Sequence, residues 1–281
     1  MMASELIAFD LDGTTLNSNS KISERNYSAL RKAYETGIKL VPCTGRSMFE
    51  IPEELFYLLD EFGFSVFPWI ITDNGSLVYD LERKELIYTN VIPKKTALAI
   101  LAEGRKRLAL SYGSFGIQGA TDTKGLIWEA EEAKPFIKSY EEKWDLPTAN
   151  LEELIEWNEG MVKMSINFMY AKDCESCLNE FSLWPDIALT SAAEKNMEVM
   201  IAGTSKGKAL EYVSRYCGIP MERIMAIGDN QNDMEMIQSS GFGIAMGNAI
   251  PELKKKADWV TAANDDDGLA LAIEKMLNEK A

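Results

Sequence analysis

The stretch Asp10-Leu11-Asp12-Gly13-Thr14-Thr15 follows directly after the short apolar run Leu6-Ile7-Ala8-Phe9. An apolar run of this length, bounded by a glycine, predicts a buried strand of the parallel type. Residues at positions i and i+2 of an extended strand share one face, so both carboxylates point the same way. Gly13 then allows the chain to turn sharply and leave the sheet.

Two carboxylates in this position need a partner. Like charges about 6–7 Å apart repel unless a cation lies between them. Mg²⁺ suits the place, because one or two carboxylates and a substrate phosphate typically hold it. A solvated loop with two ordinary acids is the alternative for the motif alone, since short motifs often match by chance.

Composition narrows the function. The chain has 281 residues, enough for one large domain or two modest ones. Its 29 basic against 44 acidic residues give a net charge of −15, which argues against nucleic acid or an anionic membrane surface as a partner. There is no histidine, which excludes histidine triads, phosphohistidine chemistry and the common zinc sites that contain histidine. Acid–base chemistry must therefore come from carboxylates, Lys, Tyr or Cys.

The four cysteines and the lengths of the apolar segments indicate the cellular compartment in which we expect the protein. Cys174-Glu-Ser-Cys177 has the spacing of a redox or zinc pair, but no second pair lies nearby, so reduced helix cysteines are favoured. The chain does not open with a signal peptide, and no apolar run approaches about 18 residues. We expect a cytoplasmic protein.

Strands and helices alternate at both ends of the chain. This alternation predicts an α/β fold with a doubly wound parallel sheet, built from residues 1–82 and 191–281. Its expected strands after the first are Ile38–Val41, Trp69–Thr72, Met197–Ile201, Ile224–Ile227, Phe242–Ala245 and Trp259–Val260. Asn74-Gly75 before Leu77–Tyr79 predicts a hairpin turn. Residues 83–190, with longer helical patterns and one alternating strand, are expected to form an inserted α/β cap domain.

Three further loops of this outer domain carry polar groups that suit a phosphate or a metal. Thr44-Gly45-Arg46 offers a hydroxyl and backbone N–H groups ahead of a helix, although Thr44 alone resembles an N-cap. Lys206 opens a helix, where a lone lysine is usually a surface residue. Gly228–Asp233 is dense in acids and amides, and alone it could be an Asx-rich turn. Ligands bind such sheets outside the carboxyl ends of the strands, so the four loops together predict one phosphate and Mg²⁺ site.

These motifs also carry a family resemblance. DLDGTT (10–15), CTGR (43–46), SKGKAL (205–210) and GDNQND (228–233) are similar, in order, to the four motifs of the haloacid dehalogenase superfamily. ITDNG (71–75) and GIAMGNA (243–249) make the chain resemble the Cof-type phosphatases of its subfamily IIB. The matches span the outer domain, whereas the cap carries none. Thr15 stands where leucine is more usual, a departure that we expect to be harmless.

The resemblance implies roles for individual residues. Asp10 would be the nucleophile that forms an aspartyl-phosphate, and Asp12 would protonate the leaving oxygen and then deprotonate the attacking water. Asp10, the carbonyl of Asp12, and Asp229 would bind Mg²⁺. The rest of the implied site consists of residues that orient this shell, Asn232 and Asp233, and residues that hold phosphate or substrate, Thr44, Gly45, Lys206 and Asn74.

The expected function is a Mg²⁺-dependent phosphatase for a small phosphorylated metabolite, such as a sugar phosphate. A phosphomutase uses the same phospho-aspartate, and a phospho-acceptor module of receiver type gathers similar residues, so both stay open. A receiver module, however, needs no insertion of about a hundred residues. The cap would select the leaving group, with Lys124, Trp128, Lys163 and Tyr170 as candidates that could equally be ordinary surface or core residues. Nothing in the sequence indicates an oligomeric state.

Overall fold

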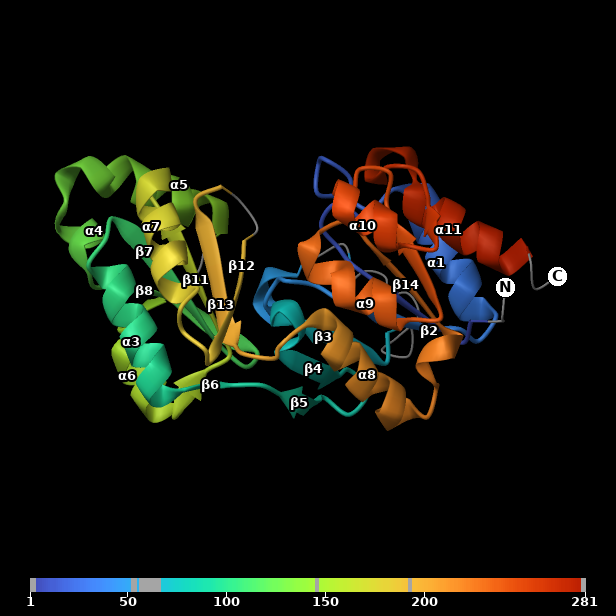
Figure 1. Cartoon of the computed structure of the whole chain (residues 1–281), viewed down its shortest axis with the longest axis horizontal. Helices are drawn as coiled ribbons and strands as arrows, with labels where there is room; N and C mark the ends of the chain where they lie inside the picture. The colour runs from blue at the N-terminus through green and yellow to red at the C-terminus, as the bar shows by residue number, and fades with distance from the viewer. Residues whose placement is uncertain (1–3, 52–54, 56–66, 145–146, 192–193, 279–281) are drawn as a thin grey trace. The chain divides into compact units, whose positions relative to one another are not determined.

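The computed structural model describes residues 4–51, 55, 67–144, 147–191 and 194–278. Two compact units make up the chain, and both are built from separated segments (Figure 1). Unit 1 comprises residues 1–46, 51–88 and 205–281, and unit 2 comprises residues 47–50 and 89–204. The second unit is therefore inserted into the first, as the sequence predicts for a cap.

A five-stranded parallel sheet forms the centre of unit 1, with the strand order β16-β15-β14-β1-β2. β1 (Leu6–Phe9) lies between β14 (Ile224–Gly228) and β2 (Lys39–Pro42), and all four of its side chains are fully buried. β15 (Phe242–Ala245) and β16 (Trp259–Val260) extend the sheet beyond β14. Since β1 pairs on both sides, its apolar run is continuous, as predicted for a buried parallel strand.

Helices cover this sheet. α1 (Glu24–Glu35) packs against α11 (Gly268–Asn278), and Figure 1 shows both on the opposite side of the sheet from α9 (Met234–Ser239) and α10 (Pro251–Lys256). α8 (Lys206–Cys217) packs against α9. The doubly wound α/β prediction is thus confirmed. At the N-cap of α1, the Ser23 hydroxyl accepts from the N–H of Asn26.

A small antiparallel sheet, β3-β4-β5, completes unit 1. β3 (Trp69–Thr72) and β4 (Leu77–Asp80) form the predicted hairpin around Asn74, joined by a short 3-10 turn, Asp73–Gly75, and β5 (Glu85–Thr89) follows. An isolated bridge between Cys43 and Ile71 attaches β3 beside β2. The helix predicted to begin near Ser47 is represented by a 3-10 turn, Met48–Glu50, and most of its later part lies outside the described residues.

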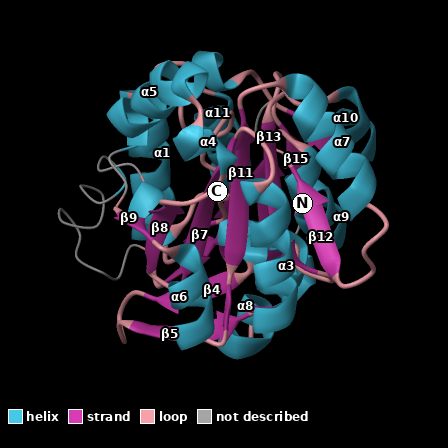
Figure 2. Cartoon of the chain, turned by 90° about the vertical axis from the view of Figure 1, so that its left-hand side faces the viewer, coloured by secondary structure: helices cyan, strands magenta, loops and turns pink. Residues whose placement is uncertain are grey.

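Unit 2 is a six-stranded sheet with the order β12-β13-β11-β7-β8-β9 and a short β6–β10 pair (Figure 2). Helices α3 (Lys94–Arg105), α6 (Leu151–Trp157) and α7 (Ala171–Phe181) pack around one apolar core with strands of this sheet. The remaining elements are β6 (Ile92–Pro93), β7 (Ala109–Phe115), β8 (Gln118–Asp122), α4 (Leu126–Glu129), α5 (Lys134–Trp144), β9 (Thr148–Ala149), β10 (Gly160–Met161), β11 (Lys163–Phe168), β12 (Ile187–Thr190) and β13 (Asn196–Ile201).

The structure shows the surroundings of Cys174 and Cys177 and the length of the described helices. Cys174 and Cys177 are free thiols buried in the apolar core of unit 2, as the helix-cysteine interpretation requires. Burial raises the pKa of both thiols, to about 11 for Cys177, so neither suits a metal or a redox role. Among the helices that the structure describes, none is both long enough and apolar enough to cross a membrane.

The expected domain boundaries differ from the observed units in one important place. The run Met197–Ile201, predicted to belong to the parallel sheet, forms β13 and pairs antiparallel with β11 and β12 in unit 2. Unit 2 therefore comprises residues 47–50 and 89–204, whereas the expected cap covers residues 83–190. The physical reason lies in the pattern: Met197 and Val199 enter the apolar core, while Glu198 between them faces away from it, an alternation typical of antiparallel strands.

Candidate active site

Three adjacent parallel strands bring the predicted polar loops together. β14, β1 and β2 lie side by side, and their carboxyl ends are followed by Asp229, by Asp10 and by Thr44. The fourth group, Lys206, does not arrive from a strand of this sheet, because β13 belongs to unit 2. It arrives instead at the first position of α8, whose N-cap is Ser205. The prediction that these four loops meet is nevertheless correct.

Lys206 lies at the centre of this arrangement. Its side chain is fully buried, and its Nζ donates to Asp10 Oδ1 at 2.7 Å and to Asp233 Oδ1 at 2.7 Å. Although burial opposes its charge, the carboxylates of Asp10 and Asp233 raise the pKa of Lys206 above its ordinary value. The charged ammonium thus bridges the loop after β1 and the loop after β14.

Negative charge exceeds positive charge in this cluster. Asp10, Asp229 and Asp233 each offer an oxygen within 4.8 Å of the others. Burial, followed by the charge of Asp233, raises the pKa of Asp10 well above its ordinary value despite Lys206. The same two causes raise the pKa of Asp229 to about 6. Three carboxylates against one lysine leave a formal excess of two negative charges, which a divalent cation would balance.

The donor set fits Mg²⁺. Asp233 is saturated, since its Oδ2 accepts the N–H groups of Asp229 and Asn230 and its Oδ1 accepts from Lys206. Asp229 keeps an oxygen available, because only its Oδ1 accepts, from the Thr14 hydroxyl at 3.1 Å. The buried Oδ1 of Asn232 accepts no hydrogen bond from any described residue. Hard oxygen donors of this kind are those that Mg²⁺ prefers.

Asp12 is placed differently from the other acids. Its carboxylate is exposed and lies outside the acidic cluster, where it accepts two hydrogen bonds from one guanidinium. Arg46 Nε donates to Oδ2 at 2.7 Å and Arg46 Nη2 to Oδ1 at 2.6 Å, a two-pronged ion pair. The two acids of the opening motif are thus distinct: Asp10 is buried against Lys206, whereas Asp12 is exposed and paired with Arg46.

The Thr44 loop and the hairpin turn lie together. Thr44 is buried, and its Oγ1 accepts the N–H of Arg46, which leaves its hydroxyl proton available for a phosphate oxygen. Its carbonyl accepts the N–H of Asn74, and a Cβ on Gly45 would lie 2.8 Å from Asn74 Oδ1. Asn74 Oδ1 also accepts from Asn232 Nδ2 at 2.9 Å. Asn74 therefore joins the Thr44 loop to the loop after β14.

Sequence reasoning did not assign a role to three residues that the geometry brings into the site. Arg46 pairs with Asp12, the Thr14 hydroxyl holds Asp229, and Asn248 donates to the carbonyl of Gly13. All three stand inside motifs quoted above, so their positions were visible, but a motif alone does not show which atoms meet.

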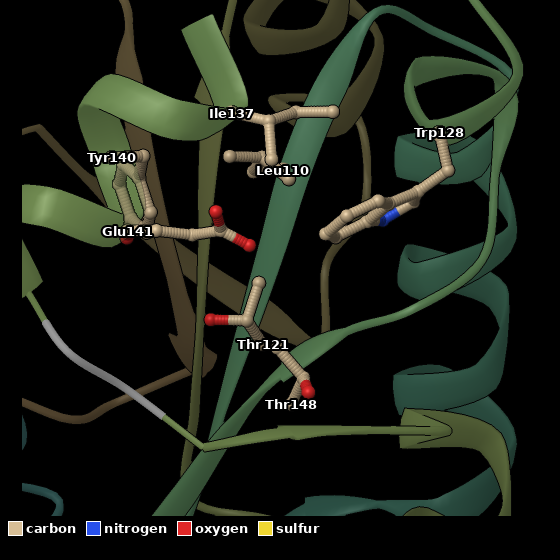
Figure 3. Close-up of a pocket in the computed structure, with 7 residues that line it drawn as sticks. All are labelled: Leu110, Thr121, Trp128, Ile137, Tyr140, Glu141 and Thr148. Atoms are coloured by element: carbon tan, nitrogen blue, oxygen red, sulfur yellow. The ribbon is translucent and has the colours of Figure 1, made fainter. Parts of the chain in front are cut away.

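The four residues suggested for leaving-group selection belong to unit 2 and have varied surroundings. Lys163 is buried and pairs with Glu198 at 3.2 Å, while Lys124 and Tyr170 are exposed. Trp128 donates its indole N–H to the carbonyl of Asp122. It also lines a small recess with Leu110, Thr121, Ile137, Tyr140, Glu141 and Thr148 (Figure 3). The described contacts of these four residues do not indicate which leaving group they would select.

Comparison with known proteins agrees with this geometry. A family model described as haloacid dehalogenase-like hydrolase matches residues 7–273. The protein named phosphatase YwpJ, from Bacillus subtilis, is 31% identical over 97% of this chain and 100% of its own length. A second Bacillus subtilis protein, named 5-amino-6-(5-phospho-D-ribitylamino)uracil phosphatase YwtE, is 29% identical over 97% of this chain and 98% of its length.

Solved structures show the same architecture. A haloacid dehalogenase-like hydrolase from Bacteroides thetaiotaomicron superposes with a TM-score of 0.82 at 29% identity, covering 97% of this chain and 99% of the other. The structure described as the HAD subclass IIB sugar phosphatase BT4131 gives a TM-score of 0.80 at 25% identity, with coverage of 97% and 98%.

Proposed function

The chain belongs to the haloacid dehalogenase-like hydrolases, among the Cof-type phosphatases of subfamily IIB, and from this premise we propose a Mg²⁺-dependent reaction through an aspartyl-phosphate on Asp10. The enzyme acts on small phosphorylated molecules as a phosphatase. One observation carries the proposal: Asp10, at the end of β1, shares a buried lysine with Asp233 inside an acidic cluster that includes Asp229.

The first step is the attack of an Asp10 carboxylate oxygen on the substrate phosphorus. A bond from this oxygen to phosphorus forms as the bond from phosphorus to the ester oxygen breaks, and the leaving oxygen takes a proton from Asp12. Lys206 and the Thr44 hydroxyl hold the transferring group, where positioning and charge neutralisation supply most of the catalysis. Mg²⁺ bound by Asp10 and Asp229, with the Asp12 carbonyl, would offset the charge of the phosphoryl oxygens.

The second step hydrolyses the aspartyl-phosphate. A water molecule attacks phosphorus and gives its proton to Asp12, now a carboxylate, while the bond from phosphorus to the Asp10 oxygen breaks. Inorganic phosphate leaves, and both aspartates return to their starting states. The chain has no histidine that could carry these proton transfers, so we assign both of them to the carboxylate of Asp12. The exposed position of its carboxylate, which water can reach, supports this role.

The substrate that we propose is a phosphate ester of a sugar or a related polyol. The support comes from relatives, one named for a phospho-D-ribitylamino compound and one solved as a sugar phosphatase. No described contact favours a phosphomutase, and membership of a hydrolase family argues against a receiver-type module. A panel of phosphorylated metabolites, assayed for phosphate release, would identify the preferred leaving group.

Hydrolysis of p-nitrophenyl phosphate tests the proposal. We expect turnover with Mg²⁺ and none after chelation by EDTA, and Asp10→Asn should abolish it because an amide is a poor nucleophile. Asp186→Asn is the matched control, since Asp186 is exposed in unit 2 and should retain the wild-type rate. Activity that survives EDTA would contradict the metal assignment, and activity of Asp10→Asn would remove Asp10 as nucleophile.

A further inference from the structure

Two backbone hydrogen bonds join the segment Met246–Ile250 to the loop that carries Asp229. This segment contains the end of the GIAMGNA motif. The N–H of Met246 donates to the carbonyl of Gly228 at 3.0 Å, and the N–H of Ile250 donates to the carbonyl of Asp229 at 3.0 Å. These bonds hold the two peptide groups on either side of the Asp229 α-carbon. The segment therefore fixes one half of the acidic cluster through the main chain.

The side chain of Asn248, in the same segment, reaches the other half. Its Nδ2 donates to the carbonyl of Gly13 at 2.8 Å, and its Oδ1 accepts the N–H of Asn264 at 2.9 Å. With one donor and one acceptor contact, both ends of the amide are used in a fixed orientation. Asn248 thus connects the loop after β1 to the loop after β14.

Gly13 is where these two loops touch. Its φ of +73° is left-handed, and a Cβ built on it would lie 2.4 Å from Asp229 Oδ2. The next residue, Thr14, donates its hydroxyl to Asp229 Oδ1 at 3.1 Å. Because the Gly13 backbone packs directly on the Asp229 carboxylate, a small movement of the Gly13–Thr14 peptide moves that carboxylate relative to Asp10.

We propose that Asn248 is a positioning residue of the metal site. By holding the Gly13 carbonyl and, through its own segment, the Asp229 backbone, it sets the separation of the oxygens that Asp10 and Asp229 present to a divalent cation. The inference rests on the proposed function only in taking Mg²⁺ as the cation. The described side-chain contacts of Asn248 are with Gly13 and Asn264, not with the carboxylate oxygens of Asp10 or Asp229. We therefore expect its substitution to change the affinity of the site for Mg²⁺.

A pair of asparagine variants separates positioning from plain structural support. Asn248→Ala removes the hydrogen bond to Gly13, whereas Asn264→Ala removes a similar one, from Asn264 Nδ2 to the carbonyl of Leu16 at 2.9 Å, farther along the same loop. Mg²⁺ is titrated into each full-length protein without substrate, and the rise in melting temperature gives the half-saturating concentration. We expect about a tenfold increase for Asn248→Ala and less than a twofold change for Asn264→Ala.

Asn248→Asp is a second variant that keeps the test valid if Asn248→Ala does not fold. The aspartate keeps the size of asparagine and the acceptor for the N–H of Asn264, but it cannot donate to Gly13. Its added negative charge alone would favour Mg²⁺, so weaker binding by this variant supports positioning. Equal binding by wild type and both Asn248 variants, or equal loss in Asn264→Ala, overturns the inference. If wild type itself binds no Mg²⁺, the proposed metal fails and this inference with it.

Discussion

At the scale of single residues, Lys206 has the largest consequences for stability and function. It is the fully buried cation between Asp10 and Asp233, and burial raises the pKa of Asp10 despite this cation. A buried charge that loses its partner is much more costly than an exposed one, because water cannot replace the partner. Lys206 therefore favours the ionised form of Asp10, the nucleophile that we propose, and we propose that it also holds phosphate.

Lys206→Met tests this role with little change in side-chain volume. At pH 7.5 we expect the free energy of unfolding to fall by about 3–5 kcal/mol, since two carboxylates are left facing each other. Activity should be lost as well. Lys208→Met, an exposed position on the same helix, should change stability by less than about 0.5 kcal/mol. Chemical denaturation measures both, and equal stabilities would contradict the account.

The raised pKa of Asp229, about 6, predicts how pH acts on the metal-free protein. Between its ordinary value of 3.8 and about 6, the folded chain binds the proton that the unfolded chain has released. The contribution of Asp229 to stability therefore falls as pH rises through this interval, and stays lost above it. Mg²⁺ offsets the charge, so it should raise the melting temperature more at pH 7.5 than at pH 5. Equal rises at both pH values would refute the assignment of Asp229.

At the scale of elements, the Asp73–Gly75 turn contacts the groups that we propose to hold phosphate. Its Asn74 contacts the Thr44 loop, and its Gly75 packs on the start of α8. Asp73 and Asn74 both have left-handed φ angles, 52° and 55°, which non-glycine residues rarely adopt. Such conformations persist where the surroundings enforce them, often at functional sites. The turn joins three loops of the site, which the hairpin prediction alone did not show.

Gly75→Ala should therefore impair activity as well as folding. The new Cβ would lie 2.2 Å from the carbonyl oxygen of Ser205, which must shift and carry Lys206 with it. Gly37→Ala is the matched control: its φ of +83° is similarly strained, but nothing lies within 4 Å of its Cβ. We expect both variants to lose about 1 kcal/mol of stability or more from strain. A large fall in kcat should be confined to Gly75→Ala, and equal rates in the two variants would contradict the role of the turn.

Strand identity could be predicted from the sequence more safely than strand partners. The apolar runs of β1, β14 and β15 predicted their places in the parallel sheet, because burial on both faces leaves a continuous apolar signature. β13 was placed in the wrong sheet, since an apolar run does not state which strands it pairs with. The site showed the same limit: its acids and lysine were predictable, but the contacts of Arg46 and Asn248 depend on tertiary packing.

At the scale of the whole molecule, one chain forms two separately packed units, each with its own sheet. The residues that we propose as catalytic belong to unit 1, while β13 leads from unit 2 directly to Lys206 in unit 1. Native-state hydrogen exchange should therefore group the amides of β13 with those of β11 and not with those of β14. Exchange of β13 in step with β14 would instead support the original assignment to the parallel sheet.

Mass spectrometry can test directly whether Asp10 carries the phosphoryl group as an aspartyl-phosphate. Asp12→Ala should still accept phosphate from p-nitrophenyl phosphate, whose leaving group needs no protonation, but should release it slowly. After reaction with Mg²⁺ and acid quenching, we expect one phosphoryl group on the peptide that contains Asp10, and none in Asp10→Asn. Phosphate release without that modified peptide, or a phosphoryl group on another residue, would contradict the account.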